Sequence, residues 1–173
     1  AVASVEGTHT AFGSVGATVG FYLFAYLLMT LLGFLSLTLV STQSRGDDLQ
    51  HFNGLSKRSP FVAFCLLVSM ASLAGIPLTA GFYGKFLVFS QAINAKQWTL
   101  IGIGMITVAA GFYFYFRVVA AMYWQEPTDT TPIHVSPLSR FAMVALVVSI
   151  FFFGINPAPI LSSLRSPATA LAK

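Results

Sequence analysis

The sequence predicts an all-α membrane protein, a bundle of four transmembrane helices of which the second is discontinuous. Its 173 residues are 56% hydrophobic and only 8% charged, whereas a soluble domain has about 25% charged residues. The mean hydropathy is correspondingly high, at +0.80. Four apolar runs reach the roughly 20 residues that a helix needs to cross a bilayer, and they are 16–40, 61–93, 98–123 and 138–161. These runs are continuously apolar rather than alternating, which favours helices over barrel strands.

The charged and metal-binding residue types exclude several classes of function. The net charge of +4 is spread along the chain without a basic cluster, so we expect no nucleic-acid partner. The single cysteine, Cys65, lies in an apolar run, which excludes a disulfide framework and a cysteine-ligated metal site within this chain. Asp47, Asp48 and His51 in the first polar connection are more typical of a solvated loop than of a metal site. We therefore expect no metal and no cofactor-binding residue.

The polar connections alternate between two faces of the predicted membrane domain. One face holds 41–59 and 124–137, and the other holds 1–15, 94–97 and the tail from Ser162. Five basic residues belong to the first of these faces and three to the second, namely Arg45, Lys57, Arg58, Arg117 and Arg140 against Lys96, Arg165 and Lys173. The positive-inside rule then predicts that the loops 41–59 and 124–137 are cytoplasmic and that the C-terminus lies outside.

The second apolar run contains helix-breaking residues near its middle. As one straight helix, 61–93 would be about 50 Å long at 1.5 Å per residue, well beyond the roughly 30 Å hydrocarbon core. Pro77 removes a backbone donor and clashes with the preceding turn, while Gly75 and Gly81 relax the backbone. We expect two half-helices joined by an irregular segment near 75–81. Irregular backbone at membrane depth survives where it is buried in protein or lines a wet cavity, and in transporters it builds ion sites near the midplane.

An ionisable side chain follows this break. Lys85 comes directly after Gly84 and is about 15 Å from the polar turn at Asn94, which is too far for complete snorkelling. Burial disfavours the ammonium form, whereas the carbonyl groups freed at the break favour it as hydrogen-bond acceptors. A lysine balanced between these effects can take up and release a proton, so we interpret Lys85 as a proton relay and the glycines and proline around it as the helix break.

Less specific interpretations of these residues remain open. Residues 61–80 could span the bilayer by themselves, which would leave Lys85 as an interfacial anchor, or the proline could kink the helix without a functional role. Arg117, in the aromatic end of the third run, is either a snorkelling anchor, which we favour, or a buried partner of an acidic group outside this chain. Arg117 and Tyr83 are our candidate supporting residues.

The sequence around the break carries a family resemblance. Residues 72–86 read Ser-Leu-Ala-Gly-Ile-Pro-Leu-Thr-Ala-Gly-Phe-Tyr-Gly-Lys-Phe. This stretch closely resembles the twelfth-helix motif of subunit N, an antiporter-like membrane subunit of the proton-pumping NADH–quinone oxidoreductase known as respiratory complex I. Residues 21–31 resemble the preceding helix of that subunit, and residues 112–119 resemble its penultimate helix. Since the chain also begins with alanine rather than methionine, we expect a C-terminal fragment of such a subunit.

The resemblance implies a fourteen-helix antiporter-like fold made of two inverted five-helix repeats, each with a broken helix and a central ionisable residue. It implies that Lys85 passes protons in a reaction coupled to quinone reduction elsewhere in the complex. Quinone, flavin and iron–sulfur clusters are then expected in other subunits, with no redox centre in this chain. The implied partners are other membrane-arm subunits and the lipid bilayer of a bacterial inner membrane or an equivalent energy-coupling membrane.

Two other functions fit the same motif. The D-type subunit of multisubunit sodium/proton antiporters resembles it and also uses a lysine at this place. A non-conducting membrane scaffold, whose broken helix only packs against partners, is the alternative from a different class. The glutamate–lysine pair of the family's first broken helix is not found in this sequence, so we do not expect this chain to pump protons alone.

Overall fold

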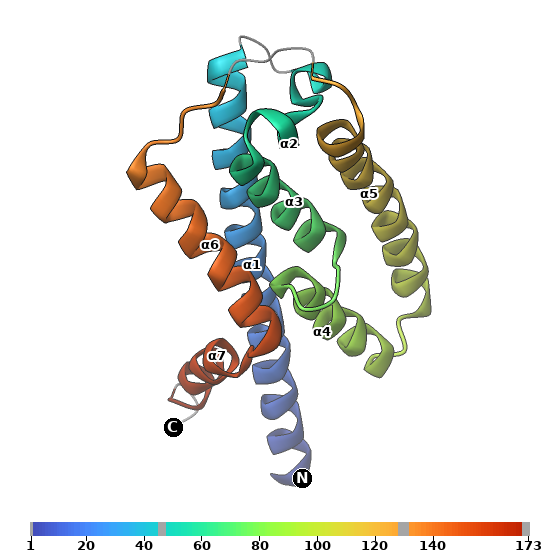
Figure 1. Cartoon of the computed structure of the whole chain (residues 1–173). Helices are drawn as coiled ribbons and strands as arrows, with labels where there is room; N and C mark the ends of the chain where they lie inside the picture. The colour runs from blue at the N-terminus through green and yellow to red at the C-terminus, as the bar shows by residue number, and fades with distance from the viewer. Residues whose placement is uncertain (1, 45–47, 128–131, 171–173) are drawn as a thin grey trace.

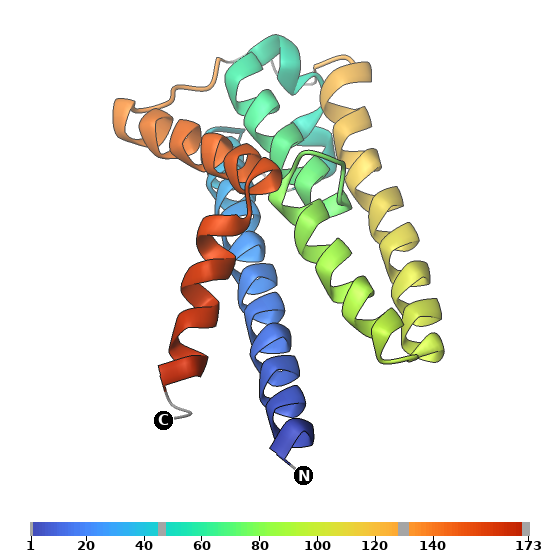
Figure 2. The ribbon, with the colours of Figure 1, turned by 90° about the horizontal axis from the view of Figure 1, so that it is seen from below.

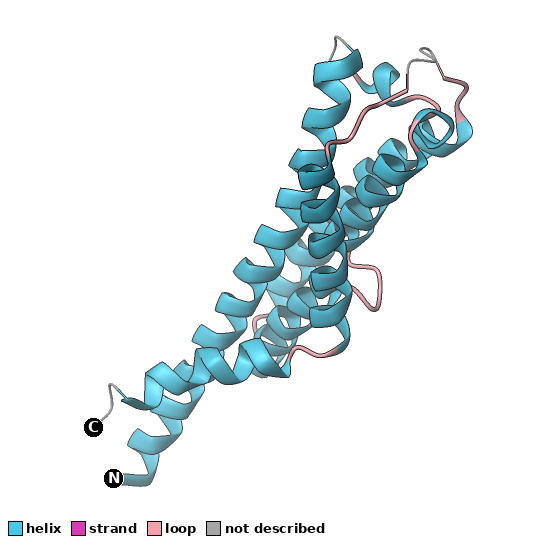
Figure 3. Cartoon of the chain, turned by 60° about the vertical axis from the view of Figure 1, so that its left-hand side comes forward, coloured by secondary structure: helices cyan, strands magenta, loops and turns pink. Residues whose placement is uncertain are grey.

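The computed structural model describes residues 2–44, 48–127 and 132–170, and these residues form helices without a β-strand (Figure 3). The elements in chain order are α1 (Val2–Ser44), the 3₁₀ helix η1 (Leu49–Phe52), α2 (Leu55–Arg58), α3 (Pro60–Ala74), α4 (Ala80–Asn94), α5 (Trp98–Trp124), α6 (Pro137–Ile155) and α7 (Ala158–Ala170). The predicted all-helical class is therefore confirmed. Arg45 and Asp47 of the first polar connection and Lys173 of the tail lie outside the described residues.

The longest helix, α1, forms the axis of the molecule, and α3, α4, α6 and α7 pack against it (Figures 1 and 2). It extends beyond the expected segment 16–40 at both ends, because no proline precedes Pro60 and every residue of α1 keeps its backbone donor. The core lies between α1, α3 and α6. Its largest fully buried side chains include Met29, Leu32, Leu66, Met143 and Ile150.

The expected second segment, 61–93, corresponds to two short helices. Both α3 and α4 have 15 residues, so each is about 22 Å long and shorter than the hydrocarbon core. In Figure 1, α3 lies beside the upper half of α1 and α4 beside its lower half. Among the described residues, three helices are long and apolar enough to cross a membrane, namely Val15–Ser44, Trp98–Trp124 and Pro137–Ile155, and α3 is a shorter apolar helix.

The expected fourth segment, 138–161, is not a single helix, and this prediction needs correction. Helix α6 ends at Ile155, and the chain turns at Asn156 (φ −126°, ψ 83°) before α7 begins at Ala158. The physical reason is Pro157, because a proline disfavours helical backbone at the residue before it. The helix α7 then continues alongside the N-terminal part of α1 (Figure 2), and the Leu164 side chain packs on Gly20.

The two polar connections that the sequence assigned to one face lie together at the upper end of Figure 1. The Lys57 ammonium forms an ion pair with Glu126 at 2.8 Å. The Gln43 side chain donates to the His134 carbonyl at 2.9 Å and accepts from the His134 N–H at 2.8 Å. The Gly54 N–H donates to the carbonyl of Ala121 at 3.1 Å. The start of α1 and the end of α7 lie toward the opposite end of the molecule.

Candidate functional site

The end of α3 is set by a glycine rather than by the proline itself. Gly75 adopts a left-handed conformation (φ 87°, ψ 43°), which costs a residue without Cβ very little. Its N–H donates to Ser72 at 3.1 Å, and the next N–H, of Ile76, donates to Ala71 at 3.0 Å. This pair of bonds is the Schellman motif, which satisfies carbonyls at a helix C-terminus. Pro77 follows two residues later and prevents the helix from resuming at once.

The start of α4 is fixed by a hydroxyl cap and by a close contact with α3. Thr79, buried at 2% exposure, accepts a hydrogen bond from the Phe82 N–H at 3.4 Å, as an N-cap residue does. The Gly81 N–H donates to the Ser72 hydroxyl at 3.2 Å. A Cβ on Gly81 would overlap the Ser72 carbonyl oxygen. Only glycine at this position lets the first turn of α4 lie against the last turn of α3.

The five residues between the two helices include one with unfavourable backbone geometry. Leu78 has φ 75°, a conformation that costs an L-residue with a side chain roughly 1–2 kcal/mol. Its side chain is 64% exposed, so side-chain burial does not compensate for this cost. The surrounding contacts of the break must hold this geometry.

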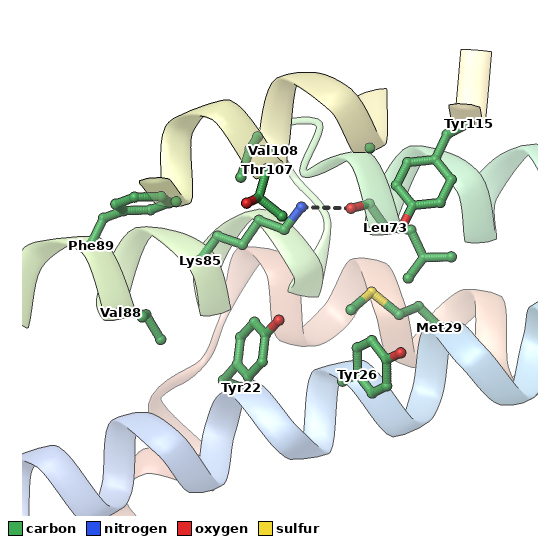
Figure 4. A pocket seen from close by; sticks show the side chains of 12 residues that line it. Tyr22, Tyr26, Met29, Leu73, Lys85, Val88, Phe89, Thr107, Val108 and Tyr115 are labelled. Atoms are coloured by element: carbon green, nitrogen blue, oxygen red, sulfur yellow. Dashed lines mark hydrogen bonds between the residues drawn. The ribbon is translucent and has the colours of Figure 1, made fainter. Parts of the chain in front are cut away.

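The side chain of Lys85 reaches back from α4 to the C-terminal end of α3. Its Nζ donates to the carbonyl oxygen of Leu73 at 2.6 Å and to that of Ala74 at 3.3 Å (Figure 4). The carbonyl end of a helix carries partial negative charge, so two main-chain dipoles face the ammonium group. A Cβ on Gly75 would lie 3.2 Å from the Lys85 Cδ. Gly75 therefore both ends α3 and leaves room for the lysine stem.

Lys85 is half-buried and lines a pocket of about 330 Å³ between α1, α4 and α5 (Figure 4). This volume exceeds that of a single water molecule in the liquid, which is roughly 30 Å³. Besides the lysine, four hydroxyl-bearing side chains line it, from Tyr22 and Tyr26 on α1 and from Thr107 and Tyr115 on α5. None of the described residues that line it carries a carboxylate. The arrangement can hold water and hydroxyl groups next to an amine.

Of the predicted site residues, only Lys85 lines this pocket. Gly81 and Gly84 lie inside α4 rather than in the break, and Gly84 lets α4 approach α1, since a Cβ there would be 3.3 Å from the Tyr22 ring. The Tyr83 ring packs edge-on against Phe21 at 5.8 Å between ring centroids. Neither Tyr83 nor Arg117, which is exposed on α5, is a lining residue.

The hydroxyl-bearing lining residues were not among the sequence candidates. Tyr22 and Tyr26 are four residues apart in an apolar helix, and this spacing puts both on one helix face. The spacing of these two tyrosines in an apolar helix could therefore have identified them as candidates from the sequence. No local signal identifies Thr107 or Tyr115, because only the packing of α5 against α3 and α4 brings them to the pocket of Lys85. Among the described residues, no group of three histidine, cysteine, aspartate or glutamate side chains could hold a metal ion.

The apolar helices, and the lysine that shares a largely apolar pocket with four hydroxyl-bearing side chains, define the chain as part of a multi-pass membrane protein with an ionisable group among its helices. The profile of the family described as "NADH:quinone oxidoreductase/Mrp antiporter, TM" matches residues 8–111, more than half of the chain. The chain belongs to this family.

Matches to individual relatives confirm the expected resemblance to subunit N. The chain is 42% identical over 127 residues to NADH-quinone oxidoreductase subunit N of Methylovorus glucosotrophus, covering 73% of this chain and 26% of the relative. It is 36% identical over 159 residues to subunit N of Paraburkholderia phymatum, covering 91% of this chain and 32% of the relative. The chain spans about a third of the length of these relatives or less.

Solved structures contain the same arrangement of helices. A chain of respiratory complex I from Thermus thermophilus with bound aureothin is 33% identical, with a TM-score of 0.76, and the match covers 86% of this chain and 34% of that one. A chain of the membrane-bound sulfane sulfur reductase, an archaeal respiratory membrane complex, has a TM-score of 0.80 at 18% identity, covering 88% and 31%. At that identity the second likeness concerns the fold alone.

Proposed function

We propose that this chain is part of the proton-translocating membrane arm of an NADH–quinone oxidoreductase, in which Lys85 takes up and releases protons. The observation that carries the proposal is the position of the Lys85 ammonium, between the Leu73 carbonyl at 2.6 Å and a pocket lined by hydroxyl groups. The family and the relatives supply the reaction to which this step would be coupled.

In this proposal α3 and α4 are the two halves of one discontinuous transmembrane segment. Together they have 30 residues in two helices, enough to cross the core only when both are used. With the three longer apolar helices, they make four transmembrane segments. The break then lies at membrane depth, where irregular backbone must line a cavity or be buried in protein. Ile76, Pro77 and Leu78 are exposed in this chain, so the proposal requires that the rest of the full-length subunit or a neighbouring subunit covers them.

The chemistry at Lys85 follows from its two sets of neighbours. When the ammonium donates to the carbonyls of Leu73 and Ala74, the proton is held by main-chain dipoles. When the amine turns toward the pocket, water can accept the proton and pass it along hydroxyl groups. The relay needs no cofactor in this chain, and electron transfer from NADH to quinone would take place on flavin and iron–sulfur clusters in other subunits.

We further propose that the end of the molecule with the Lys57–Glu126 ion pair faces the cytoplasm and that the C-terminus lies outside. The excess of basic residues at that end supports this orientation. A cysteine introduced at the exposed His134 should react with a membrane-impermeant maleimide in inside-out vesicles and stay unlabelled in intact cells. Labelling in intact cells only would reverse the assignment.

The second candidate function is that of an antiporter subunit, because the description of the matching family names Mrp antiporters beside the oxidoreductase. It predicts the same lysine chemistry but couples proton movement to a sodium gradient. Complexes purified with the full-length subunit would distinguish the two functions. Electron transfer from NADH to quinone supports the first, and sodium/proton exchange without that activity supports the second.

The test of the relay is Lys85→Ala in the full-length subunit within its assembled complex. Lys96→Ala is the matched control, since Lys96 is an exposed lysine in the turn between α4 and α5. In membrane vesicles, we expect Lys85→Ala to lower NADH-driven proton translocation at least tenfold while complex assembly stays normal. Translocation equal to that of Lys96→Ala in an assembled complex would refute the relay role.

A further inference from the structure

A glycine near the end of α6 touches the backbone of the break. A Cβ built on Gly154 would overlap the Leu78 carbonyl oxygen and the Thr79 carbonyl carbon, and would lie 2.7 Å from the Ala80 nitrogen. Real Cβ atoms essentially never come within 3.0 Å of such atoms. All three contacts are main-chain atoms, so no side-chain rotation could relieve them. In Figure 2 the end of α6 meets the start of α4.

We propose that Gly154 is a positioning residue for Lys85: by having no side chain, it lets α6 press on the break and so fixes where α4 begins. This inference rests on the proposed proton-relay function of Lys85. Gly154 lies far from Lys85 in the sequence and does not line the lysine pocket. It acts through the peptide units of Leu78–Ala80, which lead directly into the first turn of α4.

Two close contacts, one with α3 and one with α6, hold the start of α4 in place. On one side, Gly81 lies against the last turn of α3, where its N–H donates to the Ser72 hydroxyl at 3.2 Å. On the other side, the absence of a side chain at Gly154 lets the main chain of Leu78–Ala80 contact α6. Since Lys85 is four residues beyond Gly81, about one helical turn, a shift at this point moves the ammonium relative to the Leu73 and Ala74 carbonyls.

An added side chain at Gly154 would move the break rather than α6. Two side chains of α6, Met143 and Ile150, are fully buried and belong to the same core cluster as Met29 and Leu66. Moving α6 away would open this core, and close-packed interiors resist such voids. In the contacted segment Thr79 and Ala80 are also buried, but Ile76, Pro77 and Leu78 directly before them are exposed and leave the break room to shift toward its exposed side. The structure therefore predicts that a side chain added at Gly154 displaces the break and leaves α6 in place.

Gly154→Ala in the full-length subunit within its complex tests this, with Gly102→Ala as the matched control. A Cβ on Gly102, on the exposed face of α5, meets nothing within 4 Å. Because a misplacement of about 1 Å in a reacting group can cost about 100-fold, we expect Gly154→Ala to lower proton translocation at least tenfold and to alter its pH profile. Gly102→Ala should leave both near the wild-type values.

A second readout reports the position of residue 85 without using its function. In a Cys65→Ala background, a Lys85→Cys thiol is labelled with N-ethylmaleimide, with and without Gly154→Ala. We expect the labelling rate to change at least fivefold with Gly154→Ala and less than twofold with Gly102→Ala. An unchanged labelling rate in an assembled complex would overturn the positioning role. Failure of the relay itself would show instead as full activity of Lys85→Ala.

If Gly154→Ala does not assemble, the double variant Gly154→Ala/Leu78→Gly replaces it. Glycine at position 78 tolerates the positive φ of 75° at little cost and gives the break freedom to move. Assembly of the double variant with the altered Lys85→Cys labelling would support the proposal. Failure of both variants to assemble would mean that Gly154 serves folding as a whole, and this would overturn the proposal.

Discussion

Replacing Gly81 by alanine should disrupt the contact between the last turn of α3 and the first turn of α4. The new Cβ would overlap the Ser72 carbonyl oxygen and lie 2.8 Å from the carbonyl carbon and 2.9 Å from the Ser72 hydroxyl. Overpacking in a close-packed site costs about 1–3 kcal/mol. We expect about 3 kcal/mol in the free energy of unfolding, the upper end of that range, because most of the opposing atoms belong to the backbone.

The full-length subunit in detergent micelles, unfolded with increasing mole fractions of dodecyl sulfate and followed by circular dichroism, provides the assay. A loss of about 3 kcal/mol is a shift of roughly 100-fold in the unfolding equilibrium at about 1.4 kcal/mol per factor of ten. Gly102→Ala is the control, since its Cβ meets open space. A difference below about 0.5 kcal/mol between the two variants would refute the close approach of α3 and α4.

Two further predictions concern the break and the polar end of the molecule. Leu78→Gly should raise the free energy of unfolding by about 0.5–1 kcal/mol, because it removes the strain of φ 75° while the lost side chain is largely exposed. The same dodecyl sulfate titration measures this change. A lower free energy of unfolding would contradict the strained geometry. For the exposed Lys57–Glu126 pair, a double-mutant cycle with alanine should give a coupling below about 1 kcal/mol, which disappears in 1 M salt. A coupling that stays constant in high salt would mean that the pair is shielded from solvent.

The sequence alone determined the class of the protein and the presence of the break. Continuous apolar runs without charge can satisfy backbone groups in a bilayer only as helices, which is why the all-helical fold was predictable. Gly75 and Pro77 act on their own backbone and on the preceding turn, so their effect can be read without knowing any partner. Even here the physical detail differed, since Gly75 ends α3 and Pro77 only delays the next helix.

Tertiary structure decided what surrounds Lys85 and what holds the break in place. Tyr26 and Tyr115 come to the pocket from helices that are far apart in the sequence. That both line the same pocket depends on helix packing rather than on a local sequence pattern. The same is true of Gly154, whose missing side chain matters only because α6 crosses the start of α4. Local sequence specifies where a backbone must bend, but the neighbours of an ionisable group depend on which helix surfaces interlock, and that is a property of the whole bundle.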